Sequence, residues 1–127
     1  MQLAPALKGR ARVRVQAPIA LDDISEPEPD IAIVAEGRPR GSHPATALAL
    51  IEVADSSVRK DLGEKAEAYA RAAIPEYWVV NIPSQCIVVH LDPDNGRYRR
   101  ITNHVRGEAV RLQAFPDLEV AVDAILG

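Results

Sequence analysis

The feature that most constrains the fold is an almost continuous apolar run at residues 47–54 (ALALIEVA). A run of this length without alternation indicates a central strand that is covered on both faces. Glu52 lies inside the run, where its neighbours predict burial. A buried, ionised carboxylate needs a cation, hydrogen-bond donors or a raised pKa. Glu52 is therefore either a functional carboxylate or a residue at the exposed end of the strand.

The rest of the chain predicts further strands around this one. Their signals are period-two alternation or a high content of β-forming residues, at 11–17, 30–35, 76–82, 86–91, 97–102 and 108–113. The turn signal Asp94-Asn95-Gly96 predicts a hairpin between two of them. Proline and glycine predict loops at 22–29 and 36–46, and 117–126 predicts a short strand or helix.

One segment has the period of a helix instead. Apolar side chains at positions 62, 66, 69, 70 and 73 share one helical face. Asp61, with Glu64 three residues later, predicts the N-cap, and Pro75 predicts the end. The resulting order of strands and helix indicates an α/β fold, an α+β mixed sheet with a helix packed on it, in a single domain spanning residues 1–127.

The composition excludes several classes of protein. No apolar run approaches the ~20 residues that span a bilayer, so we expect no membrane association through a helix. The single cysteine, Cys86, excludes an intrachain disulfide and a cysteine-based zinc site, and it is expected to be buried. A reducing cytoplasm is the expected location. The net charge of -3 argues against strong non-specific nucleic-acid binding, although clustered arginines form either solvated strand faces or an electrostatic footprint.

Three residues suggest a metal-dependent site. Asp30 begins the strand that precedes Glu52, so the two carboxylates converge if their strands are neighbours. Two carboxylates plus water are a typical share of an Mg²⁺ or Mn²⁺ site. Lys65 lies on one helical stripe with Asp61 and Tyr69. It is either part of a surface ion pair or an ammonium that reaches the site, where it orients a water and stabilises charge on phosphate.

Other candidates have weaker signals. The three histidines, His43, His90 and His104, lack a metal-ligand spacing and are expected at the surface or satisfied within strands. Tyr77 and Trp78 are expected to pack in the core rather than to stack on bases.

Several short segments, taken in order, resemble a known family. They are 29–34 (PDIAIV), 51–57 (IEVADSS), 61–65 (DLGEK) with Tyr69, and 75–81 (PEYWVVN). The chain resembles the Uma-two family of bacterial restriction endonucleases, within the PD-(D/E)XK superfamily, over roughly residues 12–125. The resemblance implies an αβββαβ core and a divalent-metal-dependent phosphodiesterase site that uses Mg²⁺ or Mn²⁺.

By position, the resemblance assigns a role to each candidate. Asp30 matches the aspartate of the PD motif and Glu52 the second acidic ligand. Lys65 matches a lysine moved from the strand, where Ala54 now stands, to the helix. Tyr69 matches a recurrent tyrosine that packs at the site or hydrogen-bonds to it, and Asp61 matches an aspartate that helix capping explains.

The chain departs from the family in starting almost at the first strand. The N-terminal helix is therefore expected to be missing or reduced, which would expose apolar sheet surface and favour a homodimer or a higher homo-oligomer. The leading hypothesis is a metal-dependent DNA endonuclease. The alternative is a catalytically inactive, oligomeric binding or assembly module that retains the nuclease fold.

Overall fold

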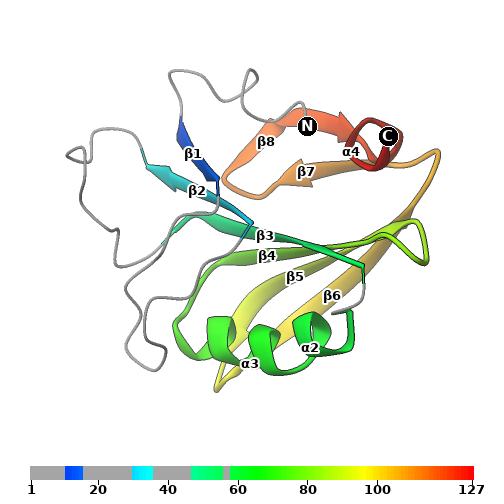
Figure 1. Cartoon of the computed structure of the whole chain (residues 1–127). Helices are drawn as coiled ribbons and strands as arrows, with labels where there is room; N and C mark the ends of the chain where they lie inside the picture. The colour runs from blue at the N-terminus through cyan, green and yellow to red at the C-terminus, as the bar shows by residue number, and fades with distance from the viewer. Residues whose placement is uncertain (1–10, 16–29, 36–46, 56–57) are drawn as a thin grey trace.

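The computed structural model describes residues 11–15, 30–35, 47–55 and 58–127 of the chain. Within them, six strands form one sheet in which each strand lies beside its predecessor (Figure 1). They are β1 (Ala11–Val15), β2 (Ile31–Ala35), β3 (Ala49–Ala54), β4 (Glu76–Asn81), β5 (Cys86–Asp94) and β6 (Arg97–Val105). All neighbours are antiparallel except β3 and β4, which are parallel. The predicted mixed sheet is confirmed.

Two layers cover this sheet. The parallel connection from β3 to β4 passes through helices α2 (Val58–Leu62) and α3 (Glu64–Arg71), which lie on one face. A separate hairpin of β7 (Ala109–Leu112) and β8 (Phe115–Ala121), followed by α4 (Val122–Leu126), lies on the other face (Figure 1). The predicted C-terminal segment thus contains both a strand and a helix.

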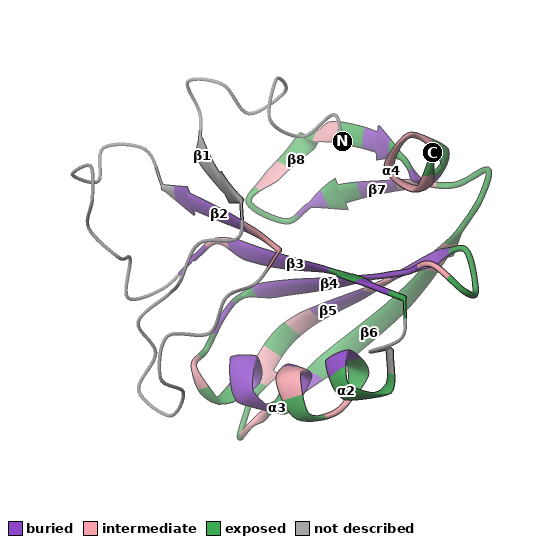
Figure 2. Cartoon of the chain, in the orientation of Figure 1, coloured by how far each residue is buried: buried purple, intermediate pink, exposed green. Residues whose placement is uncertain are grey.

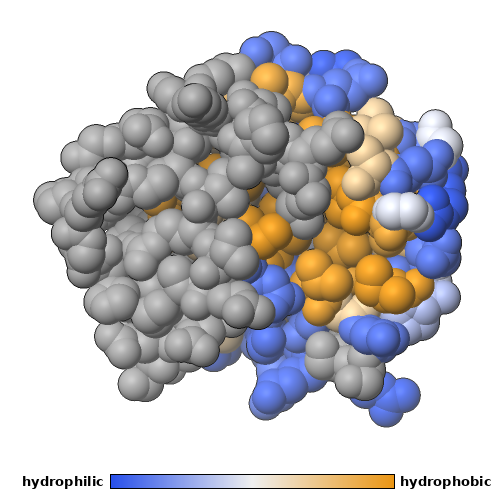
Figure 3. Space-filling model, turned by 45° about the horizontal axis from the view of Figure 1, so that its top comes forward, coloured by the Kyte–Doolittle hydropathy of each residue, from blue (hydrophilic) through white to orange (hydrophobic). Residues whose placement is uncertain are grey.

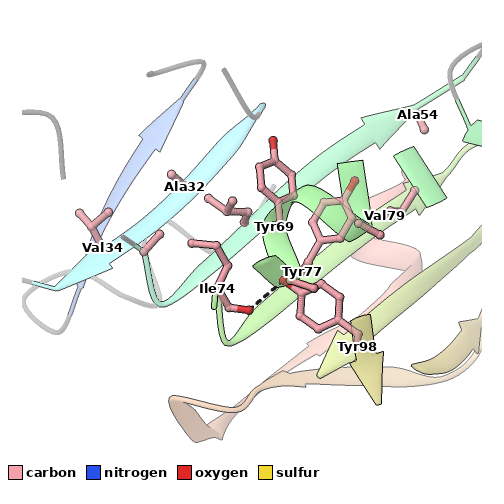
Figure 4. Close-up of a cluster of buried hydrophobic side chains, with 12 residues drawn as sticks. Ala32, Val34, Ala54, Tyr69, Ile74, Tyr77, Val79 and Tyr98 are labelled. Carbon is pink, nitrogen blue, oxygen red and sulfur yellow. Dashed lines mark hydrogen bonds between the residues drawn. The ribbon is translucent and has the colours of Figure 1, made fainter. Parts of the chain in front are cut away.

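Side-chain alternation divides the core into two clusters. On the hairpin side, Trp78 and Ile51 pack with apolar side chains of β7, β8 and α4. On the helix side, Tyr77 packs with Tyr69 of α3 and Tyr98 of β6, and the Tyr98 hydroxyl donates to the Ile74 carbonyl at 2.8 Å (Figure 4). Successive residues of a strand point to opposite faces, so adjacent aromatics feed both clusters. Figure 2 shows that the buried residues concentrate in β2, β3 and β4 and in the first part of β5.

The helical segment differs from its prediction. The chain forms two helices, and Asp61 belongs to α2 instead of capping a helix; the N-cap of α3 is Gly63, with no side-chain capping bond. The capping-box prediction is therefore wrong. The Asp61 side chain pairs with Lys65 instead of capping a helix, as described below. Leu62 is 37% exposed and Ala73 is exposed with a φ of 59°, so the predicted apolar face is confirmed only for positions 66, 69 and 70.

The turn between β5 and β6 follows its signal. Asn95 and Gly96 have φ values of 52° and 76°, the positive values that a two-residue hairpin of the I′ type needs, between the paired residues Asp94 and Arg97. The loops predicted at 22–29 and 36–46, and the missing or reduced helix ahead of β1, concern residues outside the described ranges. None of the described helices is long and apolar enough to cross a membrane.

Some apolar surface remains uncovered. Figure 3 shows apolar side chains gathered in one area of the surface, bordered in part by hydrophilic ones. Val53 of β3 is 44% exposed, and Ile82, Ile125 and Leu126 are only partly buried where they pack against the hairpin-side cluster. Association through such a surface stays a prediction.

Candidate active site at the end of strands β2 and β3

The antiparallel register of β2 and β3 brings the two predicted carboxylates together. Ile31 pairs with Ile51, and continuing this register by one residue places Asp30 opposite Glu52. The Asp30 backbone N–H donates to Glu52 Oε1 at 2.8 Å, and the Val53 backbone N–H donates to Asp30 Oδ2 at 2.6 Å. Each carboxylate is therefore held by backbone of the opposite strand. The convergence that was conditional on neighbouring strands is present.

Glu52 lies on the helix face of β3 rather than at an exposed strand end. Leu50 and Ala54, two residues to either side, belong to the helix-side cluster, and period-two alternation gives Glu52 the same direction. The Glu52 side chain is 2% exposed. The prediction of a buried carboxylate in need of partners is confirmed, and the alternative of an exposed strand end is wrong.

Lys65 supplies the cation. Its Nζ forms a short ion pair with Glu52 Oε2 and lies 3.2 Å from Asp61 Oδ1, one helical turn earlier in the chain. Both carboxylates are 2% exposed, whereas the Lys65 side chain is 35% exposed. Both interpretations of Lys65 are therefore realised in part: it pairs with Asp61 and also reaches the predicted site. An ammonium so placed leaves part of its surface open to a ligand.

Asp61 is positioned by a residue whose role the sequence did not reveal. The buried Tyr77 hydroxyl donates to the Asp61 backbone carbonyl at 2.9 Å and ties the end of α2 to β4. This bond fixes the chain four residues before Lys65. The one signal that could have linked Tyr77 to the site is that Tyr77 and Glu52 lie on paired strands and on the same face of the sheet.

Burial and charge oppose each other at this site. Burial raises the pKa of Glu52, although hydrogen bonds from Lys65 and the Asp30 backbone lower it. Burial acts to lower the pKa of Lys65, but the hydrogen bond and charge of Glu52, together with Asp61, raise it above its ordinary value. The raised pKa of Glu52 disfavours its ionised form, whereas the raised pKa of Lys65 favours its charged form. The short contact and the two acidic neighbours keep Lys65 charged at neutral pH.

Tyr69 lies behind the ion pair. It is 2% exposed, and its ring packs edge-on against Tyr77 with centroids 5.0 Å apart. Burial raises the pKa of Tyr69, and the charges of Glu52, Asp61 and Asp30 raise it further. The structure thus gives Tyr69 the packing role that was one of its two expected roles.

The remaining candidates lie elsewhere. His90 is buried with Nδ1 3.0 Å from the Tyr77 carbonyl, and His104 contacts the Thr102 hydroxyl, whereas His43 is outside the described ranges. Cys86 is buried, as expected. Four of the five exposed arginines from β6 onward pair with acids, which favours solvated strand faces: Arg99 with Asp94, Arg100 with Asp92, Arg106 with Asp123 and Arg111 with Glu119.

The donor set can be compared with the needs of a divalent cation. Asp30 and Glu52 are hard oxygen ligands on adjacent strands, the type that Mg²⁺ and Mn²⁺ accept. In the described part of the chain, no group of three or more His, Cys, Asp or Glu side chains is placed to hold a metal. Two carboxylates with the other positions left to water and phosphate still fit Mg²⁺, which usually keeps several waters.

Comparisons with known proteins bear on the fold and the family of this chain. A crystal structure titled as "a putative nuclease belonging to DUF820" from Anabaena variabilis superimposes with a TM-score of 0.74 at 14% identity, over 97% of this chain and 73% of that chain. This likeness shows that the fold is restriction endonuclease-like. None of the curated proteins matches. The family model Uma2, described as "Putative restriction endonuclease", matches residues 1–123. The chain therefore belongs to the Uma2 family, a family of nuclease-type proteins.

Proposed function

We propose that this protein is a divalent-metal-dependent endonuclease that hydrolyses phosphodiester bonds in DNA. The observation that carries the proposal is the meeting of Asp30, Glu52 and Lys65 from three separate segments at one end of the sheet. Structural ion pairs rarely need a second carboxylate on the adjacent strand, whereas phosphodiester hydrolysis uses two acids and a cation together.

Each residue has a task that its position supports. Asp30 and Glu52 would hold Mg²⁺ or Mn²⁺, which when bound supplies charge stabilisation at the phosphate and lowers the pKa of a water. Lys65 is partly exposed beside Glu52 and is placed to orient the attacking water and to stabilise negative charge on a phosphate oxygen. Asp61 holds the Lys65 ammonium from its other side, and Tyr69 packs behind it.

A second candidate is a catalytically inactive, oligomeric binding or assembly module. It is favoured by the contact between Lys65 and Glu52, which already satisfies the carboxylate without a metal, and by the pI near 5.6. The two candidates make opposite predictions about metal affinity, because a purely structural ion pair gives no reason to retain divalent-ion binding. In either case we propose a homo-oligomer in the cytoplasm.

The test is metal-dependent cleavage of supercoiled plasmid. Wild type is incubated with Mg²⁺ or Mn²⁺ and with EDTA, beside the near-isosteric Glu52→Gln variant. Glu67→Gln is the matched control, because Glu67 is an exposed acid on α3. Nicking that needs metal, is lost in Glu52→Gln and persists in Glu67→Gln supports the endonuclease.

Calorimetry separates the two candidates without relying on turnover. Wild type is titrated with Mn²⁺, and Asp30→Asn and Glu52→Gln are titrated beside it. Loss of binding in both variants supports Asp30 and Glu52 as ligands. A folded wild type that neither cleaves plasmid nor binds Mn²⁺ would leave the inactive module as the better account.

A further inference from the structure

Strand β6 ends the six-stranded sheet opposite β1. Its inner side pairs with β5 from Arg97 opposite Asp94 to Val105 opposite Cys86, with an interruption at Arg99, where Asp92 of β5 has a φ of 57°. No other strand of the described residues pairs with its outer side. Seven of its nine residues are exposed, and Figure 2 shows this strand as mostly exposed, whereas β4 is buried along its length.

An unpaired edge of this length is open to another strand. Its outward N–H and C=O groups form a ready template for pairing, and proteins usually blunt such edges with short strands, proline, bulges or charged side chains. The arginines of β6 protect only its first half in this way. The strand β6 has nine residues and no proline. Among the described residues, two of the four large exposed apolar side chains lie on it, Ile101 at 58% and Val105 at 46% exposure. These features favour a partner strand over solvent.

We propose that β6 pairs antiparallel with β6 of a second copy of this chain, about a twofold axis that passes between the two copies of Ile101, and so joins two sheets into one. A twofold axis perpendicular to the sheet keeps each side chain on its own face, so one residue must lie directly opposite its own copy, with the axis between the two. Ile101 is the middle residue of β6. Its side chain then packs against its own copy, while Arg97 lies opposite Val105 and Arg99 opposite Asn103.

The distribution of charge favours a second copy in this orientation. The three arginines of β6 all lie in its first half, at positions 97, 99 and 100, and its second half, from Ile101 to Val105, contains no Asp, Glu, Lys or Arg. Arg99 and Arg100 already pair with Asp94 and Asp92 of β5. Antiparallel pairing sets this arginine-bearing half against an uncharged half. Parallel pairing would set arginine beside arginine, which is destabilising. The edge is thus self-complementary in one orientation only.

This pairing does not depend on nuclease activity, but it has a consequence for the site. Glu52 lies on the helix face of β3, where Lys65 of α3 pairs with it. Strand β3 is three strands from the edge strand β6. The twofold axis puts both copies of the site on the same face of the joined sheet. They are separated by seven strand spacings, or ~34 Å along the sheet at ~4.8 Å per strand.

The oligomeric state is measured by light scattering and by sedimentation across a concentration series. We expect wild type to approach twice the chain mass of 13.8 kDa. Ile101→Lys places two ammonium groups beside the axis and should raise the dimer dissociation constant at least about tenfold. Val53→Lys on β3 is the matched control, because Val53 is also exposed (44%) but lies away from the edge. Far-ultraviolet circular dichroism checks that both variants fold.

Cysteine cross-linking tests the register. Directly opposed antiparallel residues have Cα atoms ~4.5–5.5 Å apart, within reach of a disulfide. Ile101→Cys should form a covalent dimer on mild oxidation, and Val105→Cys should not, because its partner in this register is Arg97; the native Cys86 is only 5% exposed. A monomer at all concentrations, a dimer broken by Val53→Lys but not by Ile101→Lys, or preferential cross-linking through Val105→Cys would each overturn the proposal.

Discussion

Replacing Lys65 with methionine isolates the role of the cation between Glu52 and Asp61. Methionine keeps most of the length and apolar stem of lysine but removes the ammonium. Glu52 and Asp61, whose side chains are both 2% exposed, then face each other without the charge that Lys65 provides. The fold keeps its packing, whereas the ionised site loses its main electrostatic support.

The expected loss of stability follows from burial. Removing one partner of a fully buried ion pair costs ~3–5 kcal/mol, because the other charge stays buried. Lys65 is 35% exposed, and solvent screens part of its interaction with both acids. We therefore expect Lys65→Met to lower the free energy of unfolding by roughly 2–3 kcal/mol at pH 7.5.

This loss should depend on pH in a defined direction. Burial already raises the pKa of Glu52 above its ordinary value of 4.5, and removing Lys65 raises it further. A group whose pKa is higher in the folded state contributes stability at low pH and loses that contribution as the pH rises through the folded pKa. Protonation of Glu52 therefore costs the variant less at pH 5 than at pH 7.5. The difference from wild type should therefore be smaller at pH 5 than at pH 7.5.

Urea denaturation of wild type and variants at the two pH values measures this difference. Lys60→Met is the control, because Lys60 is exposed on α2 and makes no ion pair in the described structure. The double variant Lys65→Met/Glu52→Gln should recover part of the loss, since it removes the stranded charge. Equal stability of Lys65→Met and wild type at pH 7.5, or a loss of the same size at both pH values, would refute the electrostatic reasoning.

Three further substitutions test other contacts. Tyr77→Phe removes the hydrogen bond to the Asp61 carbonyl. We expect the free energy of unfolding in urea to fall by about 1 kcal/mol and plasmid nicking to slow. An unchanged nicking rate would show that Tyr77 does not help to position Lys65. Glu76→Ala leaves the Trp78 Nε1–H and Gln113 N–H donors without their acceptor. The free energy of unfolding should fall by ~2–4 kcal/mol, and a decrease of less than ~1 kcal/mol would contradict this. Gly96→Ala puts a Cβ 3.1 Å from the Arg71 side chain at a φ of 76°; a thermal melt should show a loss of about 1 kcal/mol, and an unchanged melting temperature would argue against strain there.

The local features of the chain were predictable because they depend on neighbours in sequence. Period-two alternation and β-branched content placed the strands, and the helical period placed the segment that contains Lys65. Glu52 stood out because a carboxylate inside an apolar run needs partners wherever the run lies in space. The hairpin at Asn95 and Gly96 was encoded by its own turn residues.

Other features depend on contacts between distant segments, which no local pattern encodes. The capping prediction for Asp61 failed because a locally good N-cap residue was instead recruited by Lys65 and by the Tyr77 hydroxyl, which lies 16 residues later in the chain. The packing of β7, β8 and α4 over the second face also required the whole sheet to be in place.

The sequence by itself indicated which residues could form a site, because a carboxylate inside an apolar run needs partners and because the chain resembles a nuclease family at Asp30, Glu52 and Lys65. Only the tertiary structure decided that they meet. Asp30 lies opposite Glu52 because β2 and β3 pair in one register, and a shift of one residue would turn Glu52 to the other face. That register is set by the two apolar clusters on opposite faces of the sheet, whose members come from strands β2 to β8 and from helices α3 and α4.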